Sequence, residues 1–215
     1  MLTLVAIFLG YLLGSLPMGL IYVWLFTRQD VRTIGSGRTG GTNVMRAAGG
    51  RVAFSTGLSD GLKAACAIWV AQWLVPHSPW AEVLAGLAAI LGHNYSIFIG
   101  FKGGAGGAPT VGAASALWVP ALFIIAPLGG LIWYFIGYAS VTTISFAVIA
   151  TLIMAVRYAL GASPVEYIYF GVFAFLLCVW ALRPNLKRLM EGTERLHGYR
   201  AKKKASEQQA VNSEQ

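Results

Sequence analysis

Apolar residues are grouped along this chain in runs long enough to cross a lipid bilayer. The runs cover residues 3–27, 52–76, 81–100, 120–138, 140–158 and 165–183. Each has close to or more than the roughly 20 residues that a membrane-spanning helix needs. A further apolar run at 110–119 is about half that long. The pattern predicts an all-α, polytopic membrane bundle that forms one domain over residues 1–196.

Composition supports the same class of protein. Of the 215 residues, 57% are hydrophobic and 11% are charged, whereas about a quarter are charged in soluble domains. An ordinary soluble domain is therefore excluded. The first apolar run has no basic region before it, so we expect a retained span and not a signal peptide. Cys66 and Cys178 both lie in apolar runs, which indicates neither a disulfide framework nor a metal site.

The basic residues predict the topology. They are concentrated in the first polar segment and at the C-terminal end of the chain: Arg28, Arg32, Arg38, Arg46 and Arg51, then Arg183, Lys187, Arg188, Arg195, Arg200, Lys202, Lys203 and Lys204. Short basic segments stay on the cytoplasmic side, so an even number of crossings must separate the two groups. That holds if 110–119 is a short helix and Pro120 begins the next one.

We therefore predict seven membrane helices with a short fourth one, the N-terminus outside and the C-terminus in the cytoplasm. Arg157, near the outer end of the sixth helix, argues against this arrangement. Residues 197–215 are rich in Lys, Glu, Gln, Ser and Ala and are expected to form a disordered basic and polar cytoplasmic tail.

The first polar segment contains GSGRTGGTNVMR at residues 35–46, which has no hydrophobic period. Glycine lets backbone N–H groups approach an oxyanion closely. Ser36, Thr42 and Asn43 add neutral donors, and Arg38 and Arg46 could each grip phosphate with two hydrogen bonds. These residue types predict a phosphate site. The alternative is a plain turn whose arginines only fix the topology.

A second segment has a similar composition, with a cation followed by several glycines. Lys102 is followed by Gly103, Gly104 and Gly106, and the segment runs into the short helix, whose N-terminus would favour an anion. No GxxxxGK[ST] motif occurs, so we expect neither nucleotide binding nor a nucleic-acid partner.

Three further polar residues fall inside predicted spans. Asp60 and Lys63 are three positions apart and share a helix face, so they can pair. Such residues suggest a functional site, although a self-neutralised pair that orients the helix is an equal alternative. For His93 we expect a bundle-facing ring bonded to a neighbour's backbone. All three are assigned a supporting role.

Several motifs occur in an order that resembles the bacterial acyl-phosphate-dependent glycerol-3-phosphate acyltransferases, the PlsY family. They are YLLGSLPMG, GSGRTGGTNVMRAAG, DGLK, LGHNYSIFIGFKGGAGG and RPNLKRLMEGTE, and they extend over nearly the whole chain to about residue 196. The resemblance implies a seven-helix protein of the bacterial inner membrane with its active site on the cytoplasmic face. It would transfer a fatty acyl group from acyl phosphate to the 1-hydroxyl of glycerol 3-phosphate, giving lysophosphatidic acid.

The resemblance also implies roles for the polar residues. Ser36, Thr42, Asn43 and Arg46 would hold phosphate, backbone N–H groups at Gly103, Gly104 and Gly106 would add donors, and Asn185 and Arg188 would complete the site. Ser36, Arg46 and Asn185 would position the substrates, and no side chain is assigned as a general base. The expected partners are acyl phosphate, glycerol 3-phosphate and membrane lipid, with no cofactor and no metal.

The chain departs from the family pattern at informative positions. Arg38 and Gly41 replace an asparagine and an alanine, Ala105 replaces a lysine, Ser96 replaces a proline, and Leu182 or Arg183 stands where the family tends to have histidine. Losing a lysine that touches phosphate removes a bond of about 1.5–3 kcal/mol. Arg38 is a candidate replacement for that cation. A non-catalytic or altered-substrate paralogue is the main alternative, and a small transporter of anionic cargo is a third.

Overall fold

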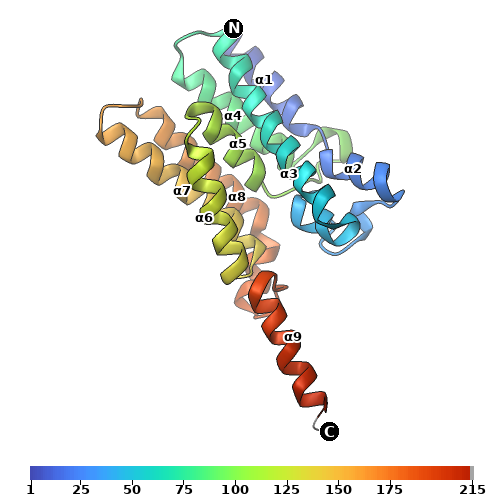
Figure 1. The fold of residues 1–215 in the computed structure, drawn as a ribbon. Helices are drawn as coiled ribbons and strands as arrows, with labels where there is room; N and C mark the ends of the chain where they lie inside the picture. Colours follow the sequence, from blue (N-terminus) through green and yellow to red (C-terminus); the bar gives the residue numbers. More distant parts are fainter. Residues whose placement is uncertain (214–215) are drawn as a thin grey trace.

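A computed structural model describes residues 1–213, and over these residues the protein is helical, with no β-strand (Figure 1). The helices are α1 (Leu2–Ser15), α2 (Met18–Thr27), α3 (Gly41–Leu74), α4 (Pro79–Asn94), α5 (Gly107–Leu117), α6 (Ala121–Phe135), α7 (Ala139–Ala159), α8 (Glu166–Met190) and α9 (Gly198–Ser213), with 3₁₀ turns at Val31–Thr33 and Ile97–Ile99. The predicted all-α class is confirmed.

Four segments are long and apolar enough to cross a membrane: Leu2–Thr27, Pro79–Ile99, Ala139–Ala159 and Glu166–Met190. Helix α6 is apolar but has only 15 residues. Large apolar side chains such as Phe8, Trp73, Phe123 and Leu152 are exposed on the outside of the bundle, as expected for surfaces that face lipid.

Proline and glycine set the helix boundaries. Pro17 separates α1 from α2, and Pro120 caps α6 and so begins a new helix after the short α5, as predicted. Helix α3 is interrupted at Gly49, where φ is 81°. The apolar run was predicted to begin only at residue 52, yet α3 already begins at Gly41. Thr42, Asn43 and Arg46 therefore lie on a short helical segment that precedes the kink.

Small residues let the helices approach closely. Helix α1 packs against α3 and α4, α5 lies against α3 and α7, and α8 packs against α4 and α7. A Cβ atom on Gly14 would lie 2.1 Å from the carbonyl oxygen of Ala89, so this α1–α4 contact requires glycine. Close backbone approach of this kind is typical of helix packing in membranes.

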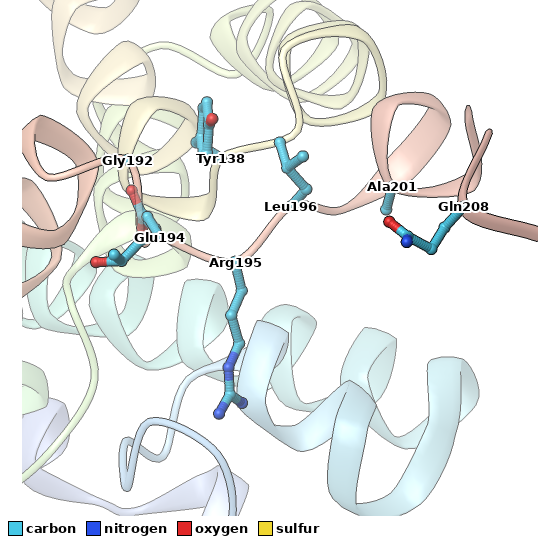
Figure 2. A pocket seen from close by; sticks show the side chains of 8 residues that line it. Tyr138, Gly192, Glu194, Arg195, Leu196, Ala201 and Gln208 are labelled. Atoms are coloured by element: carbon cyan, nitrogen blue, oxygen red, sulfur yellow. The ribbon is translucent and has the colours of Figure 1, made fainter. Parts of the chain in front are cut away.

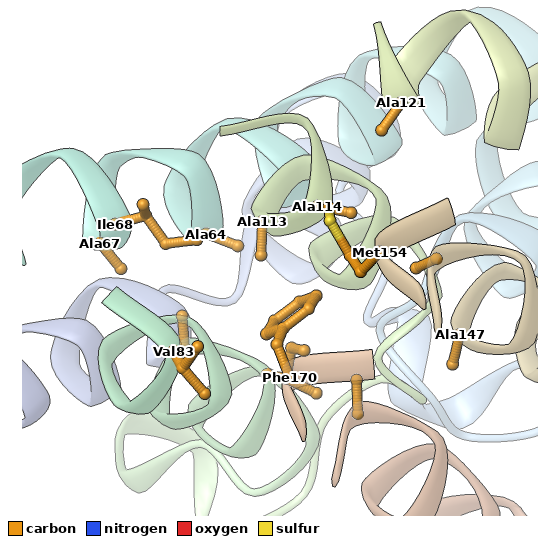
Figure 3. Packing of buried hydrophobic residues seen from close by; sticks show 14 of the residues in the cluster. Ala64, Ala67, Ile68, Val83, Ala113, Ala114, Ala121, Ala147, Met154 and Phe170 are labelled. Carbon is orange, nitrogen blue, oxygen red and sulfur yellow. The ribbon is translucent and has the colours of Figure 1, made fainter. Parts of the chain in front are cut away.

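The core is built from a few large side chains among many alanines. Ile68, Met154 and Phe170 are fully buried, and Figure 3 shows them surrounded by alanines from several helices, including Ala64 and Ala113. This core fixes the helices whose ends carry the polar segments.

The segment expected to be a disordered tail contains helix α9, Gly198–Ser213, in the structure. The same residues that keep this segment polar, Lys, Glu, Gln and Ala, are good helix formers. Lys203 and Glu207 lie one turn apart, with 3.9 Å between their charged atoms. Helix α9 contacts α6 and extends away from the bundle (Figure 1). Residues 214 and 215 of the expected tail lie outside the described part of the chain.

Candidate functional site

The amide of Asn43 shapes loop 1, which comprises residues 28–40. Asn43 is only 2% exposed. Its Nδ2 lies within hydrogen-bonding distance of the carbonyl oxygens of Val31 (3.0 Å), Ile34 (2.8 Å) and Arg38 (2.9 Å), and its Oδ1 accepts from the backbone N–H of Ser36 at 3.1 Å. The side chain predicted to donate to phosphate is thus used to fold loop 1 onto α3.

Arg46 lies one helical turn after Asn43 and beside loop 1. Its Nη1 donates to Asn43 Oδ1 at 3.3 Å, and its Nη2 lies 2.9 Å from His197 Nε2. Partial burial, followed by the like charge of Arg195, lowers the pKa of the Arg46 guanidinium. The hydroxyls of Ser36 and Thr42 make no hydrogen bond to any part of the chain described here, so they are free to bind a ligand.

Loop 2, residues 95–106, packs tightly against His93. The backbone N–H of Gly104 donates to the carbonyl oxygen of His93 at 2.9 Å. A Cβ on Gly104 would lie 1.9 Å from His93 Nε2, and one on Gly103 would lie 2.1 Å from His93 O. These two glycines are required by packing, and the predicted donor at Gly104 is already in use.

The remaining predicted residues of loop 2 lie at its two ends. Gly106 has φ of +85° and caps the N-terminus of α5. Lys102 is exposed at the start of the glycine run.

Arg38 joins loop 1 to two other parts of the chain. Its Nη1 donates to Gly104 O in loop 2 at 2.8 Å, and its Nη2 donates to Ala181 O in α8. The backbone N–H of Thr39 reaches Gly103 O at 3.4 Å. Burial lowers the pKa of the Arg38 guanidinium. The structure therefore brings the polar segments of loop 1, loop 2 and α8 together.

A buried cluster of Asp60, Lys63 and His93 packs against loop 2 through His93. Lys63 Nζ lies 2.7 Å from Asp60 Oδ1, 3.1 Å from His93 Nδ1 and 2.7 Å from Leu16 O, at the Pro17 break. The predicted Asp60–Lys63 pair is present. The His93 ring was expected to bond a neighbour's backbone. This prediction was wrong, because the ring contacts the Lys63 and Asp60 side chains.

The C-terminal end of α8 carries Asn185 and Arg188. Asn185 Nδ2 donates to Glu194 Oε1 at 3.1 Å, and Ser140 Oγ donates to Glu194 Oε2 at 2.5 Å. Glu194 is only 8% exposed. Asn185 thus anchors the segment after α8, whereas the half-buried Arg188 lies within electrostatic range of Arg38.

Two residues near Arg46 were not predicted from the sequence to belong to the site. Arg195 and His197 belong to a segment of residues 193–198, here called the strap, which passes between α8 and α9. The only indication in the sequence was a cation directly after the polar segment of α8. No pattern indicated that the strap returns to Arg46 at the start of α3.

Guanidinium groups accumulate in this region without carboxylate partners. Within residues 1–213, no carboxylate lies within ion-pairing distance of Arg38, Arg46, Arg188 or Arg195. Arg195 lies near Arg46, and Arg188 lies near Arg38. Guanidinium groups gathered without carboxylate partners favour a bound anion, and their geometry matches that of phosphate.

Two hollows adjoin this region. One of about 550 Å³ is bounded by the strap, Tyr138, Ala201 and Gln208, and no residue of loop 1 or loop 2 lines it. Figure 2 shows the Arg195 side chain directed toward the blue segments of loop 1 and the start of α3. The other is an apolar groove of about 840 Å³ between α4 and α8, lined mainly by leucines and ending at Tyr95, Trp180 and Arg183.

Comparison with known proteins identifies the family. The family model described as glycerol-3-phosphate acyltransferase matches residues 4–192. The chain belongs to this family. The glycerol-3-phosphate acyltransferase of Halalkalibacterium halodurans is 36% identical over 189 residues, which cover 86% of this chain and 90% of the relative. The glycerol-3-phosphate acyltransferase of Rubrobacter xylanophilus is 36% identical over 205 residues, which cover 94% of this chain and 98% of the relative.

A solved structure has the same fold. The chain resembles the crystal structure of PlsY, an integral membrane glycerol 3-phosphate acyltransferase, in its glycerol 3-phosphate form. The TM-score is 0.78 and the identity 32%, with 91% of this chain and 96% of that chain covered. The lysophosphatidic acid form of PlsY matches with a TM-score of 0.76. The resemblance seen in the sequence motifs is confirmed, and this member of the acyltransferase family is a membrane protein.

Proposed function

We propose that this protein transfers a fatty acyl group from acyl phosphate to the 1-hydroxyl of glycerol 3-phosphate and so forms lysophosphatidic acid. The observation that carries the proposal is the junction of loop 1, loop 2 and α8 at Arg38, next to guanidinium groups that no described carboxylate neutralises. Both substrates bear phosphate, so such a junction suits both. Family membership supports the acceptor and the product.

The proposed topology has seven membrane helices. They are α1 continued by α2, the part of α3 after Gly49, and α4 to α8. Helix α5, with 11 residues, packs against α3, α6 and α7, so these neighbours can shield its ends from lipid. With the N-terminus outside, loop 1, loop 2 and the strap all face the cytoplasm, where their basic residues favour them. We place the protein in the bacterial inner membrane.

We assign the phosphate contacts as follows. Arg46 grips the phosphate of glycerol 3-phosphate, and the free hydroxyls of Ser36 and Thr42 donate to it. Lys102, Arg188 and the N-terminus of α5 are available to the phosphate of the acyl donor. Asn43, Arg38, Gly103 and Gly104 hold the loops in shape, and Gly106 caps α5.

The chemistry requires alignment and electrostatic stabilisation. Acyl phosphate is a mixed anhydride and is already activated. The glycerol oxygen forms a bond to the acyl carbon, the bond from that carbon to the phosphate oxygen breaks, and the hydroxyl proton passes to a phosphate oxygen. Inorganic phosphate leaves. Positioned cations and N–H groups stabilise the oxyanion that develops on the carbonyl oxygen of the acyl group, and this scheme needs no cofactor or metal.

The apolar groove between α4 and α8 is suited to the acyl chain of the donor. Its walls are mainly leucines. At its end, Tyr95 belongs to loop 2, and Arg183 lies two residues after Ala181, which Arg38 contacts. A chain lying in this groove would remain in lipid-like surroundings while its phosphate reaches the cations.

The test is acyl transfer by the purified full-length chain in lipid nanodiscs. With palmitoyl phosphate and glycerol 3-phosphate, we expect inorganic phosphate and lysophosphatidic acid to appear in equal amounts, and palmitoyl coenzyme A should not replace the donor. Arg46→Ala should reduce kcat/KM about tenfold to hundredfold, whereas Arg51→Ala, which removes the same charge at an exposed site beyond the Gly49 kink, should not.

Other outcomes would overturn the proposal. Thermal stabilisation by glycerol 3-phosphate without turnover would indicate a non-catalytic paralogue that binds phosphorylated ligands. Turnover with a different acceptor would indicate an altered substrate. If glycerol 3-phosphate causes no thermal stabilisation and no turnover is seen, transport of an anionic cargo would be favoured.

A further inference from the structure

The strap is fixed at several points by bonds to the bundle. Glu194 accepts from Ser140 and Asn185. Leu196 forms an isolated antiparallel bridge with Tyr138, and the backbone N–H of His197 donates to Gly137 O at 2.8 Å. These contacts hold the strap in a defined position between α8 and α9.

An extended backbone directs alternate side chains to opposite sides. Glu194 is buried against α7 and α8, and Leu196 lies next to α7. Arg195 and His197 occupy the alternate positions: His197 contacts Arg46 directly, and Arg195 is near enough for its charge to act on Arg46. In Figure 2 the Arg195 side chain points away from Glu194 and toward the segments that carry loop 1. The geometry of the strap thus places a second guanidinium group and an imidazole next to Arg46.

His197 orients Arg46. The two nitrogens are 2.9 Å apart, and because guanidinium can only donate, His197 Nε2 must accept and the ring must be neutral. The ring also stacks on Trp133, with 5.9 Å between ring centroids, which limits its rotation. Arg46 is therefore held between Asn43 and His197, with its remaining N–H groups free.

The charges around Arg46 fit an anionic ligand. Arg46 and Arg195 are like charges, and within the described residues neither is paired with a carboxylate. The neighbouring Glu194 is occupied by Ser140 and Asn185. Ser36 and Arg46 both bond Asn43 Oδ1, so the Ser36 hydroxyl and the Arg46 guanidinium can bind one phosphate to which Arg195 adds a charge-assisted hydrogen bond.

We propose that Arg195 is a further binding residue for the phosphate of glycerol 3-phosphate and that His197 is the positioning residue for Arg46. This inference rests on the proposed function. Both residues lie beyond residue 192, where the match to the family model ends. The strap therefore adds to the site from outside the part of the chain that the family model describes.

The test compares Arg195→Ala with Lys202→Ala, which removes the same charge from an exposed site on α9. Arg195→Ala should raise the KM for glycerol 3-phosphate about tenfold to hundredfold and leave kcat within about twofold, because the lost contact is made equally in the ground and transition states. Arg195→Lys should recover part of the affinity, and Lys202→Ala should behave as wild type.

The role of His197 needs a separate pair of variants. His197→Gln keeps an acceptor for Arg46 and should retain most of the affinity. His197→Leu lacks the acceptor and should raise KM without an equal loss of kcat. Equal behaviour of the two variants would overturn the positioning role.

A binding measurement separates this inference from the proposed function. If the wild-type protein shows no turnover, only the proposed function is contradicted. The thermal shift that glycerol 3-phosphate induces in the wild type and in Arg195→Ala would still test the role of Arg195. An active enzyme in which Arg195→Ala keeps the wild-type KM and thermal shift would overturn the inference alone. A lower melting temperature of unliganded Arg195→Ala and Arg195→Gln, with an unchanged ligand-induced shift, would also overturn it, because it would indicate a structural role.

Discussion

At the residue scale, Asn43 and Thr42 are neighbours with different tasks. Both were predicted to bind phosphate, because an amide and a hydroxyl can each donate to an oxyanion. The structure separates them by burial, since the Asn43 amide is 2% exposed and bonded to loop 1, whereas the Thr42 hydroxyl has no partner within the described residues. The sequence could identify the residue types but not the direction in which each amide or hydroxyl points.

Alanine substitution should distinguish the two tasks. Asn43→Ala leaves buried carbonyl groups of loop 1 without donors and should lower stability by about 1–3 kcal/mol as well as activity. Thr42→Ala should reduce activity with little change in stability. Thermal unfolding in detergent alongside kcat/KM measures both. A fully stable Asn43→Ala would contradict the structural role of this amide.

Ala105 tests the effect of a missing cation. Ala105→Lys places a charge in loop 2 beside Gly104, which Arg38 contacts, and should raise kcat/KM by up to about tenfold to hundredfold. Gln29→Lys adds the same charge at an exposed position of loop 1 and serves as the control.

Arg38→Ala completes this comparison. Arg38 bonds two carbonyl oxygens, so its loss should loosen the junction of loop 1 with loop 2 and reduce both acyl transfer and affinity for glycerol 3-phosphate. If Arg38→Ala keeps the wild-type rate of acyl transfer and affinity for glycerol 3-phosphate, both the role of Arg38 in the junction and its replacement of the family lysine would be contradicted.

At the element scale, the boundary between α4 and loop 2 depends on a buried polar cluster. The spacing of Asp60 and Lys63 was enough to predict their pair, because residues three apart on one helix face each other. His93 comes from a different helix, and no sequence period links it to that pair. The consequence is functional, since His93 leaves no space beside Gly104.

A double substitution tests this packing. Gly104→Ala would place a methyl group 1.9 Å from His93 Nε2 and should destabilise the protein by about 1–3 kcal/mol and reduce activity. His93→Ala makes room, so the double variant should be less impaired than the sum of the two single variants. Gly130→Ala has no atom within 4 Å of the new methyl group and is the matched control. Strict additivity would contradict the contact.

Other elements show what local patterns can and cannot predict. The short α5 and the start of α6 after Pro120 followed from proline chemistry and the parity of the basic segments. The helical start of α3 at Gly41 was missed, because glycine is a poor helix former and tertiary contacts, including those of the buried Asn43 and Val44, fix this segment. Helix α9 was missed because its composition suits both a helix and a disordered tail.

At the scale of the whole molecule, three polar segments distant in the sequence meet at one end of the bundle. Counting basic residues predicted that they share a side of the membrane, but it could not predict their contacts or the return of the strap. Arg157, which argued against this topology, has its guanidinium group 4.4 Å from the ring centroid of Trp118 and bonded to Ala162 O. A charge with these partners is compatible with an outer interface.

Cysteine labelling tests the proposed topology. After Cys66 and Cys178 are replaced by alanine, Ser36→Cys should react with a membrane-impermeant maleimide only in inverted vesicles, because loop 1 is cytoplasmic. His77→Cys, in the connection between α3 and α4, should react only in right-side-out vesicles. Labelling of both positions from the same side would contradict the seven-helix arrangement.

The most direct test of the shared phosphate site is an experimental structure of this protein with glycerol 3-phosphate bound. We predict that the phosphate lies within hydrogen-bonding distance of the Arg46 guanidinium, between loop 1 and the strap. A phosphate bound instead in the hollow between Tyr138 and Gln208, out of reach of Arg46, would contradict it.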